Sequence, residues 1–317
     1  MKEKVLAIVG PTAVGKTALS LALATKFNGE IISGDSLQVY RHLDIGTAKI
    51  TAAERGQVPH YLLDIRDVSD SFSAYDFKVA AGRLITEISG RGHLPIIVGG
   101  TGMYLASLLK DFTLGATTDT PVTAQAQQRV RQQLAAEWQA LGSQAMWQRL
   151  ATVDPDAAAG IPAKNRQRVL RALEVWQLTG QRFSAQPPLT APYDAFVLGL
   201  NCQRPLLYQR INQRVEQMVA AGLADEARWL FQQVDPEAQA AKGIGYREWP
   251  PYFQQQASLA ATITAIQTDS RHYAKRQLTY FRHQFATHWF DLLDQPQSAQ
   301  LEIDTALTQW LRTAPPA

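Results

Sequence analysis

The sequence predicts an α/β fold in which helices flank a parallel sheet and an all-helical insertion interrupts the chain. Three observations lead to this prediction. Short apolar runs alternate with helical patterns in the first third, a glycine-rich pattern joins the first run to a helix, and an apolar run returns at residues 195–200 after a long stretch without one. Such alternation is typical of parallel strands connected by helices.

The most informative segment is residues 10–17, which directly follow the apolar run 5–9. The segment matches the pattern G-x-x-x-x-G-K-[ST] in the required order of strand, loop and helix. In this pattern backbone N–H groups surround an anion, Lys16 adds a positive charge and Thr17 offers a hydroxyl group to Mg²⁺. We therefore expect a P-loop NTPase-like core that binds a diphosphate or triphosphate, although the loop does not indicate whether the phosphate is transferred, hydrolysed or expelled.

The other elements are predicted from hydrophobic periodicity. In the first third we expect strands at residues 5–9, 31–33, 60–65 and 95–98, and helices at residues 16–27, 75–91 and 103–109. Later in the chain we expect a strand at 195–200, helices at 205–233 and 258–285, a strand at 289–292, and a last helix that ends near residue 311.

Residues 124–180 differ in character from the first third. They are rich in Gln, Arg and Ala, and they show helical periodicity without a strand-like run. A connector that contains Thr, Gly and Pro precedes them, and three prolines close the block. The sequence therefore predicts a core formed by residues 1–117 and 191–317, with a helical insertion at residues 118–190.

Composition narrows the class of protein. The chain has 317 residues, of which 46% are apolar, so a large core or two domains can form. The net charge of +3 is weak evidence for a nucleic-acid partner. Cys202 is the only cysteine, so no disulfide can form within the chain. Because no apolar run resembles a signal peptide or reaches the length of a membrane span, we expect a cytoplasmic protein with no membrane partner.

Two predicted strands lead to the carboxyl edge of the sheet, where ligands of open α/β sheets bind. One is followed by an acidic residue and the other by a glycine-rich segment. Asp35 follows strand 31–33, and it could bind Mg²⁺ through water, act as a general base or cap the next turn. Strand 95–98 is followed by the glycine-rich residues 99–102 and not by an acid. This second segment is a poor metal site, and it could form either a second anion cradle or a plain turn.

Basic residues gather in three segments, at residues 164–171, 242–247 and 271–282, and aromatic residues are interleaved with them in the last. Cations that contact phosphates and rings that stack on bases suit single-stranded or looped RNA. The alternative is that each segment is a solvated helix face. The histidines show no spacing typical of a metal site, and the sequence contains no Cys/His zinc pattern.

An ordered series of motifs through nearly the whole chain resembles the bacterial tRNA dimethylallyltransferases, also called isopentenyl-tRNA transferases. After the phosphate loop, the series continues at residues 35–40, 44–49, 99–104, 168–174, 210–222, 243–248 and 275–282. A single phosphate loop is common to many enzymes, whereas the ordered series is specific to this family.

The resemblance implies transfer of a dimethylallyl group from dimethylallyl diphosphate to N6 of the adenine that follows the anticodon on its 3′ side. It implies that Asp35 is the general base, and that Lys16 and Thr101 also take part in catalysis at the leaving diphosphate. Mg²⁺ would be held by Thr17 and Asp35. The diphosphate contacts of the family correspond here to Gly10, Thr12, Ala13, Val14, Gly15, Lys16, Thr17 and Arg214.

The resemblance also implies a macromolecular partner, the anticodon stem-loop of a tRNA, which the helical insertion would clamp while the protein acts as a monomer. The residues expected to contact tRNA are Asp35, Ser36, Leu37, Gln38, Thr101, Thr123, Gln167, Arg168, Arg171, Lys242, Gly245, Tyr246, Arg247, Lys275, Arg276, Gln277 and Arg282.

Two departures from the family pattern are local. Residues 163–165 read Ala-Lys-Asn where the family often has Pro-Asn-Asp, and Ile50 stands where a proline is common. Two other kinds of function are weighed against the resemblance. One is a small-molecule kinase that uses ATP at the same loop, and the other is a non-catalytic RNA-binding or ATPase switch module.

Overall fold

The computed structural model describes residues 2–111, 124–185 and 190–314. The chain forms two compact units, one made of Met1–Asp111 with Ala191–Ala317 and the other of Phe112–Thr190. Each unit has its own hydrophobic core, as expected for a segment that folds around its own apolar residues.

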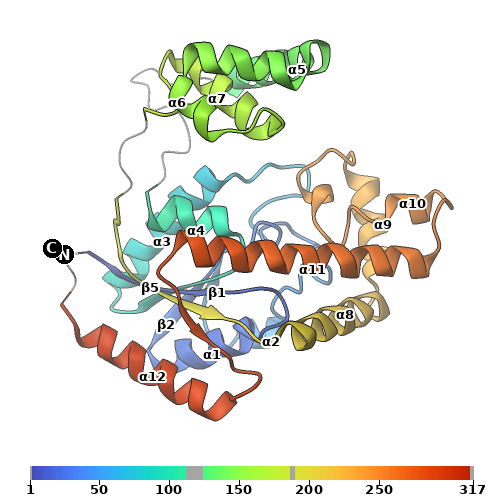
Figure 1. The fold of residues 1–317 in the computed structure, drawn as a ribbon. Coiled ribbons are helices and arrows are strands. Elements are labelled where there is room, and N and C mark those ends of the chain that lie inside the picture. Colours follow the sequence, from blue (N-terminus) through green and yellow to red (C-terminus); the bar gives the residue numbers. More distant parts are fainter. Residues whose placement is uncertain (1, 112–123, 186–189, 315–317) are drawn as a thin grey trace. The chain divides into compact units, whose positions relative to one another are not determined.

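The larger unit is built on a six-stranded sheet in its described residues, with the order β3-β2-β4-β1-β5-β6. Figure 1 labels β1, β2 and β5 of this sheet. All neighbouring strands are parallel. The strands are β1 (Lys4–Val9), β2 (Gly29–Ser33), β3 (His60–Tyr61), β4 (Leu94–Val98), β5 (Asp194–Leu200) and β6 (His288–Phe290). The predicted α/β class with a parallel sheet is therefore confirmed.

Helices cover both faces of this sheet because the central strand β1 is apolar on both sides. Val5, Ala7 and Val9 face a core shared with α3 (Ala74–Gly90), α4 (Gly102–Leu109) and α11 (Leu259–Gln284). Leu6 and Ile8 face a second core, formed with α1 (Lys16–Lys26) and α12 (Pro296–Arg312). Since successive side chains of a strand point to opposite faces, five consecutive apolar residues supply both layers.

Two predicted elements are wrong in extent, and both errors lie at residues with positive φ. The strand expected at 60–65 ends at Tyr61, because Leu62 and Asp64 have φ values of 60° and 56°. The helix expected at 205–233 is two helices, α8 (Arg204–Ala220) and α9 (Leu223–Gln233). They are separated at Gly222, whose φ of 104° is incompatible with a continuous right-handed helix.

Three short helical elements escaped the sequence prediction. They are α2 (Ala52–Arg55), the 3₁₀ turn η1 (Ala240–Lys242) and α10 (Pro250–Phe253). Each is four residues long or less, which is too short for a periodic apolar pattern to show.

The smaller unit consists of α5 (Ala124–Val153), α6 (Pro155–Gly160) and α7 (Arg166–Thr179) in its described residues. Leu134, Met146 and Leu150 of α5 pack against Val169 and Leu173 of α7. On the same helix, Glu174 pairs with Arg131 at 2.7 Å and with Arg171 at 3.0 Å. Throughout the chain, no described helix combines the length and the apolar character needed to cross a bilayer.

Candidate active site

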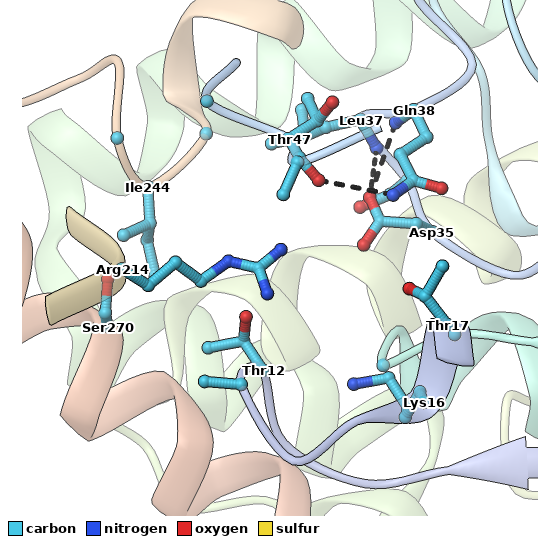
Figure 2. A pocket seen from close by; sticks show the side chains of 18 of the residues that line it. Thr12, Lys16, Thr17, Asp35, Leu37, Gln38, Thr47, Arg214, Ile244 and Ser270 are labelled. Carbon is cyan, nitrogen blue, oxygen red and sulfur yellow. Dashed lines mark hydrogen bonds between the residues drawn. The ribbon is translucent and has the colours of Figure 1, made fainter. Parts of the chain in front are cut away.

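A cavity of about 670 Å³ opens at the carboxyl ends of β1, β2 and β4 in the larger unit. The phosphate loop after β1, the turn after β2 and the glycine segment after β4 all line it, together with α8 and α11. Ten of its side chains are labelled in Figure 2. The cavity thus lies where parallel sheets of this kind bind their ligands.

The phosphate loop is held in place by contacts with its carbonyl oxygens. Lys16 Nζ donates to the carbonyl oxygen of Gly10 at 3.0 Å and to that of Pro11 at 2.6 Å. Arg210 of α8 donates from Nε to the carbonyl oxygen of Ala13 at 2.8 Å. Ala13 itself has a φ of 68°, so the loop is held in a conformation that few non-glycine residues adopt.

Two cations face the cavity without a carboxylate bridge among the described residues. Burial and the positive charge of Arg214 lower the pKa of Lys16 to about 7, although Asp35 acts in the opposite direction. Burial also lowers the pKa of Arg214, and its Nε atom is buried without a hydrogen-bond partner in the described chain. Two basic groups without a salt-bridge partner, close to a phosphate loop, are typical of an anion site.

Asp35 lies in the turn after β2. Its Oδ1 atom accepts hydrogen bonds from the backbone N–H of Leu37 at 2.8 Å and of Gln38 at 3.4 Å. The side chain therefore does cap the turn, which was one of the three roles weighed from the sequence. Figure 2 shows its carboxylate turned into the cavity, toward the side chains of Arg214 and Thr17. Because a carboxylate offers about four lone pairs, the cap leaves room for a second role.

The glycine segment after β4 packs closely against its neighbours. A side chain at Gly99 would lie 2.3 Å from the backbone of Gly34, so the glycine is explained by close packing. Thr101 does not line the cavity, but its hydroxyl accepts the backbone N–H of Ser36 at 3.1 Å. The segment therefore supports the turn that carries Asp35.

The residues expected to contact RNA do not all lie together. Eight of them line the cavity with Asp35, namely Ser36, Leu37, Gln38, Lys242, Gly245, Arg247, Arg276 and Gln277. Lys275 and Arg282 are exposed on α11, where the Arg282 guanidinium lies 5.5 Å from the centre of the Trp289 ring. Gln167 and Arg168 are exposed on α7 of the smaller unit, and Thr123 lies outside the described residues. Gly10 and Val14 belong to the phosphate loop but do not line the cavity.

Tyr246, which is expected among the tRNA contacts, is buried in the structure. Its side chain is 0% exposed, and its hydroxyl donates to Glu226 at 2.6 Å, so it cannot stack on a base in this conformation. Phe281 is likewise 0% exposed. Arg247 lines the cavity, but its charge is already paired with Asp269 and Glu248. Two of the aromatic residues in the basic segments, Tyr246 and Phe281, therefore belong to the hydrophobic core.

Sequence reasoning assigned no role to two residues of the helices that follow β5, one that lines the cavity and one that bonds to its wall. Arg210 lies one turn before Arg214 on α8, and this i, i+4 spacing could have placed both on the cavity face. Glu226 of α9, which accepts the backbone N–H groups of residues 44–46, had no such signal. A single acid in an amphipathic helix looks like a solvated residue.

The residues present fit a magnesium ion. No cluster of three or more His, Cys, Asp or Glu side chains suitable for a metal occurs in the described residues. Thr17 and Asp35 both line the cavity, and Figure 2 shows them on neighbouring sides of it. Mg²⁺ prefers hard oxygen ligands and usually takes only one or two from the protein, with substrate phosphates and water completing its shell.

Comparison with known proteins places this site in a family. The family model described as IPP transferase matches residues 38–284. The chain is 51% identical over 311 residues to a tRNA dimethylallyltransferase of Latilactobacillus sakei, covering 98% of this chain and 99% of the relative. It is 56% identical over 309 residues to one of Levilactobacillus brevis, covering 97% and 98%.

Solved structures agree with this result. The crystal structure of a tRNA isopentenylpyrophosphate transferase from Bacillus halodurans matches with a TM-score of 0.73 and 45% identity, covering 98% of this chain and 97% of that one. A eukaryotic dimethylallyltransferase described as acting on tRNA matches with a TM-score of 0.81 and 28% identity, covering 97% and 79%. The chain belongs to the IPP transferase family.

Proposed function

We propose that this protein is a tRNA dimethylallyltransferase. It transfers the dimethylallyl group of dimethylallyl diphosphate to N6 of the adenine that follows the anticodon on its 3′ side, and releases diphosphate. The observation that carries the proposal is the cavity in which two unbridged cations, Lys16 and Arg214, face the phosphate loop beside the carboxylate of Asp35. An anion site next to a base suits alkyl transfer with an anionic leaving group.

The phosphate loop would hold the diphosphate of the prenyl donor. As the bond between the prenyl carbon and the diphosphate oxygen breaks, negative charge grows on that oxygen. Lys16, which is held by two carbonyl oxygens of the loop, and Arg214, which lines the same cavity, would stabilise this charge on the leaving group. Thr17 and Asp35 would hold Mg²⁺, which would supply further neutralisation of the charge on the diphosphate.

Asp35 would act on the adenine. The N6 lone pair is delocalised into the ring, so the amine is a weak nucleophile and must lose a proton as the carbon–nitrogen bond forms. The Asp35 carboxylate turned into the cavity is the group proposed to accept that proton. Such positioned base catalysis contributes about 10²–10⁴-fold in rate. The electron pair of the broken N–H bond stays on nitrogen, and the diphosphate leaves with the electron pair of the broken carbon–oxygen bond.

The tRNA would reach the cavity with its target base out of the stack, which costs a few kcal/mol. Lys242 and Arg276 line the cavity and are exposed, so they suit contacts with the phosphates of the anticodon loop. We propose that the smaller unit is the insertion that clamps the stem, with Gln167 and Arg168 on its exposed helix face. We also propose that the enzyme acts as a cytoplasmic monomer.

The proposal is tested with purified protein, Mg²⁺, dimethylallyl diphosphate and an unmodified tRNA that carries adenine after the anticodon. Mass spectrometry of the digested nucleosides should show N6-dimethylallyladenosine. A parallel reaction with radiolabelled ATP should show no phosphate transfer. Absence of the prenylated nucleoside with a folded, tRNA-binding protein, together with phosphate transfer from ATP, would favour the kinase interpretation.

A further inference from the structure

One wall of the cavity is an irregular turn, residues 44–48, which we name the wall turn. Gly46, Thr47 and Ala48 of the wall turn line the cavity. Three successive backbone N–H groups of this turn, those of residues 44, 45 and 46, point at one carboxylate, that of Glu226 on α9. The N···O distances are 2.8, 2.8 and 2.9 Å. A single side chain from a distant part of the chain therefore satisfies the backbone donors of this wall.

Tyr246 completes the arrangement around Glu226. Its hydroxyl donates to the Oε1 atom of Glu226 at 2.6 Å, and its ring is wholly buried. A Cβ atom added at Gly46 would lie 2.6 Å from the Tyr246 side chain, so a residue with a side chain does not fit at this position of the wall turn. The buried tyrosine thus orients the carboxylate and supports the turn from behind.

The wall turn is connected to Asp35 by a short series of hydrogen bonds. The Thr47 carbonyl oxygen accepts from Gln38 Nε2 at 3.2 Å, and Gln38 Oε1 accepts from Ser33 Oγ at 2.9 Å. The backbone N–H of Gln38 donates to Asp35 Oδ1 at 3.4 Å. Figure 2 shows Thr47, Gln38 and Asp35 side by side. The position of the wall turn therefore affects the turn that presents Asp35.

The end of the wall turn has a separate anchor. Lys49, whose side chain is 1% exposed, donates to Asp44 at 2.7 Å and to Asp64 at 2.6 Å. This anchor fixes the two ends of the segment to each other. Thr47 Oγ1 also donates to the Leu43 carbonyl oxygen at 2.6 Å. Neither contact satisfies the three N–H groups that face Glu226, so this part of the turn is held by that carboxylate.

We propose that Glu226, oriented by Tyr246, is a positioning residue for the transfer reaction. It holds the wall turn so that Thr47 and Gln38 keep Asp35 directed at the adenine. Glu226 reaches no substrate in this arrangement, because its carboxylate is fully engaged by backbone and phenol donors. The inference rests on the proposed function, and it adds to that function a residue that sets the geometry of the base.

The test is Glu226→Gln measured in single-turnover prenylation with saturating tRNA. The amide would turn an NH₂ donor toward N–H donors, so the wall turn should shift. Because misplacement by about 1 Å can cost about 100-fold, we expect the transfer rate to fall by about 10- to 100-fold. The KM for dimethylallyl diphosphate should change by less than about twofold, because the hydrogen bonds described for the phosphate loop do not involve residues 44–48. Hydrogen–deuterium exchange should become faster at residues 44–48.

The matched control is Glu30→Gln. Glu30 is also a buried carboxylate with several partners, Arg91, Tyr61 and His93, but it is near the amino end of β2 and does not line the cavity. This variant should lose stability while its transfer rate and the exchange of residues 44–48 stay at the wild-type level. A general loss of stability would instead affect both variants alike.

If Glu226→Gln does not fold, Tyr246→Phe decides the question, because it removes one of the four donors. Its transfer rate should fall by about two- to tenfold, in line with the loss of one hydrogen bond. Unchanged transfer rates in the folded variants, with unchanged exchange at residues 44–48, would overturn the inference. An inactive wild-type protein would instead overturn the proposed function, so the two failures are distinguishable.

Discussion

At the scale of single residues, the site depends on groups that are costly to bury. Arg214 carries a buried Nε atom without a hydrogen-bond partner in the described chain, and Lys16 donates to two carbonyl oxygens of the phosphate loop. The Asp35 carboxylate accepts a hydrogen bond from the Leu37 N–H and also faces the cavity. Stability would favour a pairing of these charges, whereas an anionic substrate requires that the cations stay available.

Asp35→Asn tests the proposed base. The amide oxygen can still accept the Leu37 N–H, so the turn should persist while the basic carboxylate is lost. We expect the rate of prenyl transfer to fall by about 10²–10⁴-fold. The affinity for tRNA, measured by filter binding, should be retained. Asp67→Asn serves as the control, because Asp67 is an exposed acid that pairs with Arg41. Normal turnover of Asp35→Asn would exclude Asp35 as the base.

Arg214→Met tests the anion site. Removal of one preorganised donor to the leaving group should lower kcat/KM for dimethylallyl diphosphate by about 10²–10³-fold. Because no described residue bridges the guanidinium, the melting temperature without ligand should be equal to the wild-type value or higher. Inorganic diphosphate should raise the melting temperature of the variant less than that of the wild type.

Arg204→Met is the control for this experiment. Arg204 lies on the same helix, is exposed and contacts only the Tyr208 ring and hydroxyl in the described structure. It should leave both kcat/KM and the response to diphosphate unchanged. A large loss of stability in Arg214→Met, with donor kinetics intact, would show that the guanidinium is structural.

At the scale of elements, strand β2 has different tasks at its two ends. Its carboxyl end leads into the turn with Asp35, and its amino end buries Glu30, which is 3% exposed. Burial would raise the pKa of Glu30, but hydrogen bonds from Arg91 and Tyr61 outweigh burial and hold the pKa below its usual 4.5. Glu30, which stabilises the fold, and Asp35, which faces the cavity, therefore lie at opposite ends of β2.

This arrangement predicts an acid-sensitive contribution to stability. A carboxylate whose pKa is lower in the folded state stabilises the fold at pH values above its unfolded pKa, and the contribution is lost as pH falls through the folded value. Glu30→Gln should therefore lower the free energy of unfolding by about 1–3 kcal/mol at neutral pH. In urea denaturation the difference from the wild type should shrink below about pH 4. An equal difference at both pH values would contradict this assignment.

At the scale of the whole molecule, features that depend on neighbouring residues could be predicted from the sequence, whereas contacts between distant residues could not. The phosphate loop is contiguous, so its strand, turn and helix were predicted correctly. The ends of β3 and α8 depend on positive φ angles at residues 62 and 222, which periodicity does not reveal. Tyr246 and Glu226 meet across 20 positions only after the chain folds, so the burial of Tyr246 and the role of Glu226 could not be read from local patterns.

The extended RNA surface is a property of the whole molecule, and Arg282 tests it. Arg282→Ala should weaken tRNA binding and make the slope of log affinity against log salt shallower by about 1, because one phosphate contact is lost. Arg83→Ala is the matched control, since Arg83 is an exposed arginine on α3 that pairs with Glu87. An unchanged slope for Arg282→Ala would place that residue outside the RNA path.

The most direct test of the central claim locates the product on the tRNA. Wild-type protein, Mg²⁺ and dimethylallyl diphosphate are incubated with an unmodified tRNA, and nuclease fragments are sequenced by mass spectrometry. Our account predicts one dimethylallyl group on the adenine that follows the anticodon, and none when guanine replaces that adenine. A prenyl group at another position, or none on a tRNA that the protein binds, would contradict it.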